Sequence, residues 1–239
     1  MKQGFVKKIF CLQFWFLVFG YSTYAQSIEG TTEQLWLEFV PHFKINDRYE
    51  FYGDGGFRVI FEESRIYTLI VRPSVRYRLN SIVELQGGIG LFYSIFDNLS
   101  NQLELRPWQG ARIHWPTFGR IGIKHSVKLE ERLLWETETW NFDPALRFRY
   151  KLGGRIPFNE SRSFYLSLFG EGFANLGGES VSILRNRMRG YLGFGYRGND
   201  TWTVELEFML QRSRSNAVED FNVSDRIFRL KVLKDGWVW

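Results

Sequence analysis

Three histidines are the residues of this sequence best suited to acid–base or nucleophilic catalysis. His42 lies near the end of an expected strand, and His114 shares a strand face with Arg112. His125 adjoins Ser126, but neighbouring residues of a strand point to opposite faces, so these two cannot form a nucleophile–base pair. We therefore predict no catalytic residue. A membrane-embedded enzyme that modifies lipid or lipopolysaccharide, in which His114 pairs with a serine of another strand, is kept as an alternative.

Metal and cofactor chemistry have no sequence pattern to support them. Cys11 is the single cysteine, and no spacing of histidine or cysteine resembles a metal-ligand set. The glycine runs around Gly88 and Gly193 lack the following helix that a phosphate loop requires. We predict no metal and no cofactor.

Arginine and glutamate recur together on one face of segments in which polar and apolar residues alternate. If the segments are barrel strands, this face lines a narrow lumen, where charges must be paired or hydrated. The candidate lumen residues are Arg72, Arg76, Glu104, Arg106, Arg147, Arg187, Glu205 and Glu207. The densest basic row, Arg185, Arg187 and Arg189 with Arg197, is interpreted as lumen arginines that glutamates across the barrel neutralise. An anion-preferring constriction, or a contact with lipopolysaccharide phosphates, is the functional alternative.

The elements that must position these charges are strands, because the dominant pattern from Gln34 onward has a period of two. In residues 202–210, for example, every second residue is apolar, and the residues between them are mostly polar. The pattern gives eleven candidate strands at about 35–43, 49–61, 65–79, 82–93, 102–115, 119–133, 138–152, 163–174, 185–197, 201–212 and 225–234. Turn residues lie between them, among them Gly153-Gly154.

Several of these strands reach the length of about 9 to 11 residues that a tilted membrane strand needs. Aromatic residues lie near strand ends, where interfacial girdles would place them: Trp36, Tyr93, Trp115, Trp135, Trp140, Trp202 and Trp237. These features predict an all-β fold, a single antiparallel up-and-down transmembrane β-barrel. Since bacterial barrels of one chain have an even number of strands, we expect ten or twelve, with 35–43 the doubtful strand.

The N-terminus has the features of a secretory signal peptide. Basic residues precede the apolar stretch 9–19, and small residues at Thr23 and Ala25 predict cleavage before Gln26. We therefore divide the chain into a signal peptide, 1–25, and an outer-membrane barrel domain, 26–239. Removing three of the 31 basic residues leaves 28 against 26 acidic ones, so the charge gives no reason to expect nucleic-acid binding. Cys11 would leave with the signal peptide.

Several sequence runs resemble a family of uncharacterised outer-membrane β-barrels of Gram-negative bacteria, described only as a domain of unknown function. The runs are 104–109 (ELRPWQ), 128–132 (KLEER), 146–152 (LRFRYKL) with 156–158 (IPF), 169–173 (FGEGF), 186–187 (NR) and 205–211 (ELEFMLQ). This resemblance implies a fold and a location but no activity, so no catalytic residue is carried over.

These observations favour a narrow channel with a charged lumen, or a structural barrel, in the bacterial outer membrane. The partners that we expect are outer-membrane lipid and lipopolysaccharide and the barrel-assembly machinery, with the protein a monomer. Alternation alone is also compatible with a soluble periplasmic β-protein that binds lipid, in which the apolar face would form the core.

Overall fold

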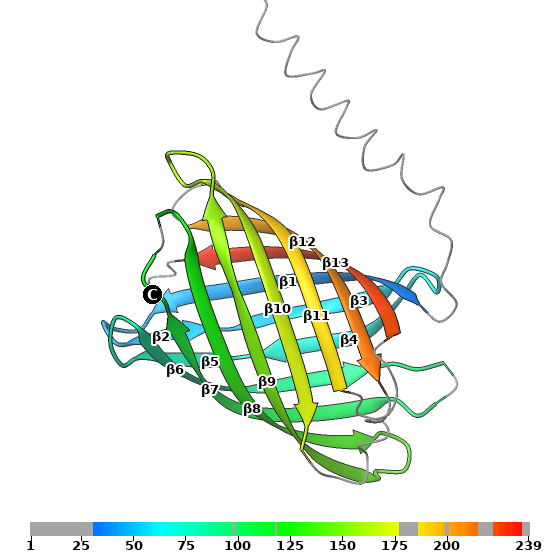
Figure 1. Ribbon diagram of the computed structural model, residues 1–239. Helices are drawn as coiled ribbons and strands as arrows, with labels where there is room; N and C mark the ends of the chain where they lie inside the picture. Colours follow the sequence, from blue (N-terminus) through cyan, green and yellow to red (C-terminus); the bar gives the residue numbers. More distant parts are fainter. Residues whose placement is uncertain are drawn as a thin grey trace, which may run out of the picture. The chain divides into compact units, whose positions relative to one another are not determined.

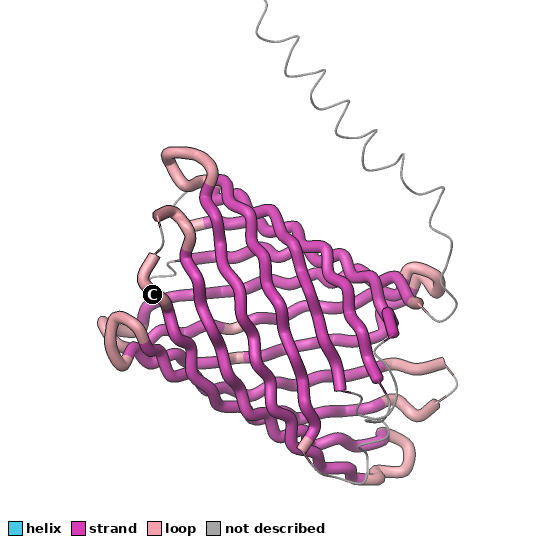
Figure 2. The backbone as a smooth tube through the Cα atoms, viewed as in Figure 1, coloured by secondary structure: helices cyan, strands magenta, loops and turns pink. Residues whose placement is uncertain are grey.

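The computed structural model of the chain describes residues 31–97, 99–117, 119–176, 186–198, 201–214 and 222–235. Throughout these residues the chain forms β-strands joined by turns (Figures 1 and 2). A helix long and apolar enough to cross a membrane is not found among them. The predicted signal peptide, 1–25, lies outside the described residues, as do Arg185 and Trp237.

Thirteen strands form one sheet, in which almost all neighbours in sequence are neighbours in space. They are β1 (Thr32–Lys44), β2 (Tyr49–Tyr52), β3 (Asp54–Ile60), β4 (Arg65–Arg72), β5 (Ser74–Arg78), β6 (Val83–Ser94), β7 (Gln102–His114), β8 (Gly122–Glu136), β9 (Phe142–Pro157), β10 (Phe164–Asn175), β11 (Asn186–Arg197), β12 (Trp202–Arg214) and β13 (Asn222–Asp235).

Two pairs of these strands are halves of one longer strand. Gly53 separates β2 from β3, and Pro73 separates β4 from β5. Proline has no backbone N–H to donate to the ladder, so the pairing is interrupted at this level of the sheet. The two halves of each strand still pair with one common neighbour. Strands β2 and β3 both pair with β1, and strands β4 and β5 both pair with β6. The wall therefore consists of eleven strands.

The sheet closes on itself through a parallel seam between β1 and β13. Eleven consecutive residue pairs join the two strands, from Thr32 opposite Asp225 to His42 opposite Asp235. Every other pairing in the sheet is antiparallel. With an odd number of up-and-down strands, the first and last run in the same direction, so only a parallel pairing can close the ring.

The closed up-and-down barrel is thus confirmed, and its wall has the eleven strands that the alternation indicates. The even count of ten or twelve differs from this by one, because the closing pair is parallel. The segment at 35–43 that seemed doubtful is β1, a full strand of the wall. The largest error in strand bounds lies at β9, which was expected to end at 152. Gly153-Gly154 is not a turn but a place where β10 approaches closely. A Cβ atom on Gly153 would lie 2.2 Å from the backbone oxygen of Leu168.

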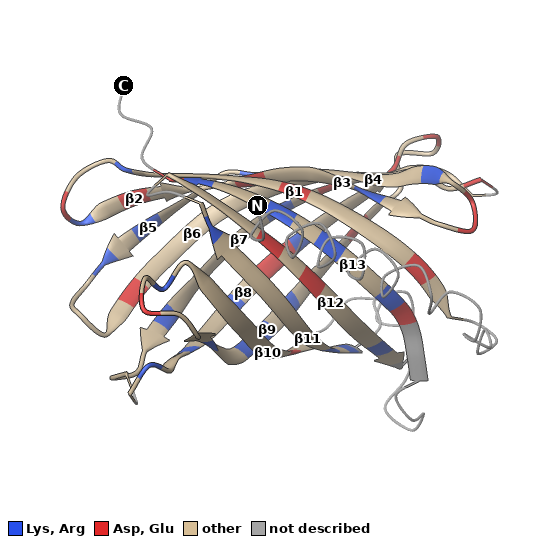
Figure 3. Cartoon of the chain, turned by 90° about the horizontal axis from the view of Figure 1, so that it is seen from above, with Lys and Arg blue, Asp and Glu red and all other residues tan. Residues whose placement is uncertain are grey.

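The two faces of the wall are segregated as a membrane barrel requires. On β12, Glu205 and Glu207 are 1% and 4% exposed, whereas Leu206 and Phe208 between and beside them are 53% and 39% exposed. Charged residues recur along the strands all around the barrel (Figure 3). The polar face points inward and the apolar face outward, which is the reverse of a soluble β-sandwich.

A small apolar cluster also lies inside the barrel, against the wall formed by β10 to β13 and β1. Its members are Trp36, Phe169, Tyr191, Met209 and Ile227. The place of Trp36 corrects the expectation that it belongs to an interfacial girdle: its indole is buried in the lumen, with the Arg58 guanidinium 3.8 Å from the ring centroid. Trp115, Trp140 and Trp202 do point outward near strand ends.

The closest approach between β3 and β1 gives a test of the packing of the wall. At Gly56, a Cβ atom would lie 2.0 Å from the backbone oxygen of Leu37, so we expect Gly56→Ala to destabilise the barrel by about 1–3 kcal/mol, the usual cost of overpacking. Gly170→Ala is the matched control, because a Cβ atom there meets nothing within 4 Å. Urea unfolding of the refolded barrel in lipid vesicles measures both; equal stability of the two variants would contradict this packing.

Candidate functional site

All eight residues predicted to line the lumen lie on the inward face of the wall. Arg72 and Arg187 are half-buried. The other six have buried side chains: Arg76, Glu104, Arg106, Arg147, Glu205 and Glu207. Their positions follow from the alternation of each strand, because residues two apart share a face. That these residues serve a function remains a proposal.

Inward carboxylates pair mainly with cations on the neighbouring strand, directly opposite in the ladder. Seven ion pairs have this geometry: Glu50 with Arg76, Asp54 with Arg72, Glu84 with Arg112, Glu130 with Arg147, Glu171 with Arg189, Glu205 with Lys231 and Glu207 with Arg229. The expectation that glutamates across the barrel neutralise the arginines is therefore corrected for Arg189, whose carboxylate partner is on the adjacent strand. Opposite residues lie about 5 Å apart, which makes direct pairing efficient.

Glu104 is the centre of one buried network. Its Oε1 atom accepts hydrogen bonds from Nε of Arg106 at 2.6 Å and Nε of Arg132 at 2.7 Å. A second bond, from Nη2 of Arg132 to Oε2 at 2.7 Å, makes the Arg132 contact bidentate. The Arg106 guanidinium also lies 3.8 Å from the ring centroid of Phe92. One carboxylate thus holds two guanidinium groups, a strong, charge-assisted geometry.

A second network joins β8, β9, β10 and β11. Glu130 accepts a hydrogen bond of 2.7 Å from Nε of Arg147 and a longer one of 3.3 Å from Nη1 of Arg149. Arg149 also donates to Glu171, whose other oxygen lies 3.9 Å from Nη1 of Arg189. Each acid in this network therefore faces two arginines.

The third network contains the two glutamates of β12. Glu207 accepts a hydrogen bond of 2.7 Å from Nε of Arg229 and lies 2.8 Å from Nζ of Lys231. Glu205 contacts Lys231 and accepts hydrogen bonds from Arg155 and Tyr165. The contact between Glu205 and Arg155 joins strands that are not adjacent, β12 and β9, so it spans part of the lumen.

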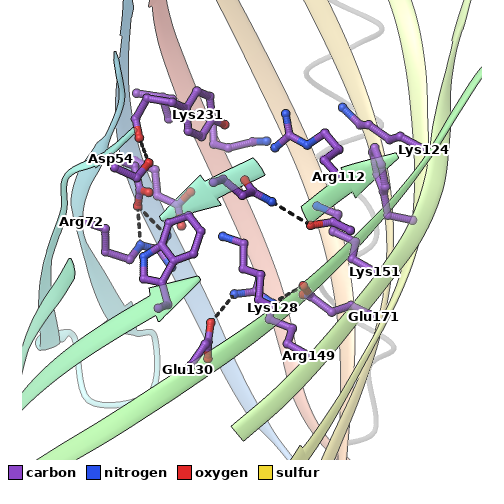
Figure 4. A pocket seen from close by; sticks show the side chains of 18 of the residues that line it. Asp54, Arg72, Arg112, Lys124, Lys128, Glu130, Arg149, Lys151, Glu171 and Lys231 are labelled. Carbon is purple, nitrogen blue, oxygen red and sulfur yellow. Dashed lines mark hydrogen bonds and ion pairs between the residues drawn. The ribbon is translucent and has the colours of Figure 1, made fainter. Parts of the chain in front are cut away.

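Between these networks the lumen contains a cavity of about 170 Å³ (Figure 4). Its lining includes ten basic residues and five acidic ones. The basic residues are Arg72, Arg106, Arg112, Lys124, Lys128, Arg149, Lys151, Arg155, Arg229 and Lys231; the acidic residues are Glu38, Asp54, Glu130, Glu171 and Glu207. The lining thus has five more basic than acidic side chains, and three of the basic ones, Arg106, Arg112 and Arg155, contact carboxylates outside the lining.

Most of the cavity lining is absent from the eight predicted residues. Only Arg72, Arg106 and Glu207 belong to both sets. The alternation that selected the eight also places Lys124, Lys128, Arg149 and Lys151 on inward faces, so it could have identified them. Knowledge of which strands face one another is needed to see that these four converge.

Among the described residues, none of the three histidines contacts a serine. The Nε2 atom of His114 lies 3.2 Å from Glu84, while Ser126 faces the lumen and accepts a hydrogen bond of 3.2 Å from the Gln86 amide. His125 points outward and contacts the Tyr150 hydroxyl, which confirms that it and Ser126 are on opposite faces. His42 lies at one end of the barrel, 2.6 Å from Asp235 and 3.1 Å from Glu50. Within the described part of the chain, no group of three potential metal ligands is found.

The family described as "Protein of unknown function (DUF2490)" matches residues 33–222, which is most of the barrel. The resemblance to a family of barrels with a domain of unknown function is therefore confirmed. No curated protein matches the sequence significantly.

Two solved structures are similar to the chain at low identity. One, from work on the mechanism of in-meso crystallization of membrane proteins, is 16% identical with a TM-score of 0.40, covering 77% of this chain and 71% of that one. The other, an anion-selective porin from Comamonas acidovorans, is 11% identical with a TM-score of 0.36, covering 79% of this chain and 55% of that one. Similarity at this level carries no argument about function.

The Glu104 network gives a test of how strongly lumen charges depend on one another. Glu104→Gln leaves the guanidinium groups of Arg106 and Arg132 without their carboxylate, and removing one partner of a buried ion pair destabilises by about 3–5 kcal/mol. The control is Glu63→Gln, which breaks a 2.5 Å pair with Arg65 at a solvent-exposed turn and should cost less than about 1 kcal/mol. Urea unfolding followed by tryptophan fluorescence compares them; a similar loss in both would show that the lumen is hydrated like the surface.

Proposed function

The chain belongs to the DUF2490 family of proteins of unknown function, and we propose that it is a narrow, anion-preferring channel of the bacterial outer membrane. In this proposal the exterior contacts outer-membrane lipid and lipopolysaccharide, and the barrel-assembly machinery inserts the protein as a monomer. The signal peptide at 1–25 would direct its export.

The outer surface of the wall supports the location. Apolar side chains point outward all around it, among them Val71, Leu168 and Leu192, each more than half exposed. A soluble monomer rarely exposes apolar surface of this extent. The strands from β6 to β13 are 12 to 16 residues long, which exceeds the minimum for crossing a bilayer. Because the sheet is closed, it leaves no unpaired edge in lipid.

The charge of the cavity lining is the observation that carries the proposed selectivity. The ten basic side chains of the lining outnumber its five acidic ones, and an enclosure lined mainly by basic groups favours anions over cations. The apolar cluster around Met209 and the ion-pair networks also lie inside the barrel, which favours a small pathway over a wide one.

The two alternatives have less support from the geometry. A lipid-modifying enzyme would need His114 beside a hydroxyl, whereas its contact is Glu84. A soluble lipid-binding protein would need an apolar interior, whereas the cavity in the lumen is lined mostly by charged side chains. A purely structural barrel has the same lumen, and conductance separates it from a channel.

Planar-bilayer recording of the refolded barrel under a KCl gradient tests the proposal. We expect a small conductance with a reversal potential that gives a chloride-to-potassium permeability ratio above one. Arg112→Gln, which removes a cation from the cavity lining, should lower this ratio, while Arg120→Gln in an exposed turn should leave it unchanged. Cation preference, or no conductance from a barrel that migrates as folded, would refute the channel.

A further inference from the structure

The cations around the cavity differ in whether a carboxylate neutralises them. Arg72, Arg149, Arg229 and Lys231 are each paired with an acid that also lines the cavity. Lys124 and Lys128 of β8 and Lys151 of β9 are different. Among the residues that the structure describes, these three amines have no carboxylate within ion-pair distance.

The register of the sheet brings these amines to one wall of the cavity. Ser126 lies opposite Lys151 on β9 and opposite Arg112 on β7, so a hydroxyl, an ammonium group and a guanidinium group form one row. Lys124 and Lys128 flank Ser126 on the same face of β8, each about 7 Å along the strand. Figure 4 shows Lys124, Lys128, Lys151 and Arg112 around the same space.

Arg112 and Ser126, the other two polar groups of this wall, can also contact an anion. Arg112 shares the single carboxylate of Glu84 with Arg76 and His114, at distances of 3.5, 3.7 and 3.2 Å. Ser126 accepts a hydrogen bond from Gln86, so its own proton is free to be donated to an anion. The wall offers donors and positive charge. The acids that adjoin it, Glu130 on β8 and Glu171 opposite Lys151, contact arginines.

Aromatic rings support the amines without neutralising them. The Nζ atom of Lys128 lies 3.4 Å from the ring centroid of Trp108, and that of Lys151 lies 4.4 Å from Phe169 and 4.6 Å from Tyr191. Cation–π contacts stabilise and orient an ammonium group but leave its charge uncompensated. Gathering several such charges in an enclosed space costs free energy that a bound anion would offset.

We propose that the wall formed by Lys124, Lys128, Lys151, Arg112 and Ser126 is a binding site for a compact, multivalent oxyanion of the phosphate or pyrophosphate class. A single chloride contacts too few of these donors to bridge them, whereas an oxyanion accepts hydrogen bonds through several oxygens at once. The cavity of about 170 Å³ has room for such an ion, since it equals the volume of roughly five or six water molecules in the liquid. This binding site rests on the proposed function and specifies the class of anion that the lumen would prefer.

Calorimetric titration of pyrophosphate into the folded barrel in detergent, at constant ionic strength, tests the site. Wild-type protein should bind one pyrophosphate per barrel, and Lys124→Gln/Lys151→Gln should raise the Kd about a hundredfold through the loss of two charge-assisted contacts. The matched control, Lys44→Gln/Lys234→Gln, removes the same charge outside the cavity lining and should keep the wild-type Kd. No saturable binding to wild type, or equal affinity in the two double variants, would overturn the proposal.

Stability separates a binding role of the lysines from a structural one. If the amines bind an anion, their uncompensated charges destabilise the barrel when no anion is present. Lys124→Gln/Lys151→Gln should then unfold at a higher urea concentration than wild type without pyrophosphate. Pyrophosphate should then stabilise wild type but not this variant. A variant that is less stable than wild type without the ligand would identify the lysines as structural and contradict the site.

Two further arms identify the source of the phosphate group and separate this proposal from the channel. Phosphatidylglycerol added to the micelles should not displace pyrophosphate, and displacement would assign the site to a lipid headgroup and overturn the proposal of a soluble ion. Because the titration needs no membrane potential, a barrel that binds pyrophosphate but carries no current would refute the channel and keep the site. A barrel that conducts chloride but binds no pyrophosphate would refute the binding site and keep the channel.

Discussion

Charges that face a narrow lumen must be neutralised by a neighbour, and the architecture of this barrel depends on that constraint. Water is scarce between packed side chains, so an unpaired charge there costs far more than on the surface. The sheet meets the constraint by placing an acid and a base directly opposite one another on adjacent strands, as Glu207 and Arg229 are. A slip of one residue in the register of β12 would turn Glu207 outward and leave Arg229 without its partner, so the charge pattern and the register specify each other.

Inward cations that no carboxylate neutralises are therefore candidates for a functional role. Around most of the lumen each acid is matched by one or two bases, and the wall between β7 and β9 departs from this rule. Lys124, Lys128 and Lys151 rest on aromatic rings rather than on carboxylates. In a barrel that pairs most of its inward charges, an unmatched basic wall beside a cavity supports the proposed anion pathway and binding site.

Much of this structure could be predicted from the sequence, because alternation is a local property. It identified the strands and the inward face, including Glu104 and Arg147. It also indicated eleven candidate strands, the number in the wall, and the even count came instead from the rule for bacterial barrels. Alternation could not show that Thr32 and Asp225, so distant in sequence, meet in a parallel closing pair. Nor could it foresee the β-bulge opposite Arg58 and Val59, beside which the Tyr67 hydroxyl donates a hydrogen bond to Gln34. The basic wall was missed because it appears only when three strands are aligned.

Contact between lipid and the outward face of this wall can be measured by spin-label accessibility. The predicted mature chain has no cysteine, so Leu168→Cys and Leu206→Cys on outward faces, and Ser81→Cys in a turn, each give one labelling site. In vesicles, labels at 168 and 206 should collide readily with oxygen and rarely with a water-soluble nickel chelate, and the label at 81 should do the opposite. Equal access of the chelate to all three labels would contradict a membrane-spanning barrel.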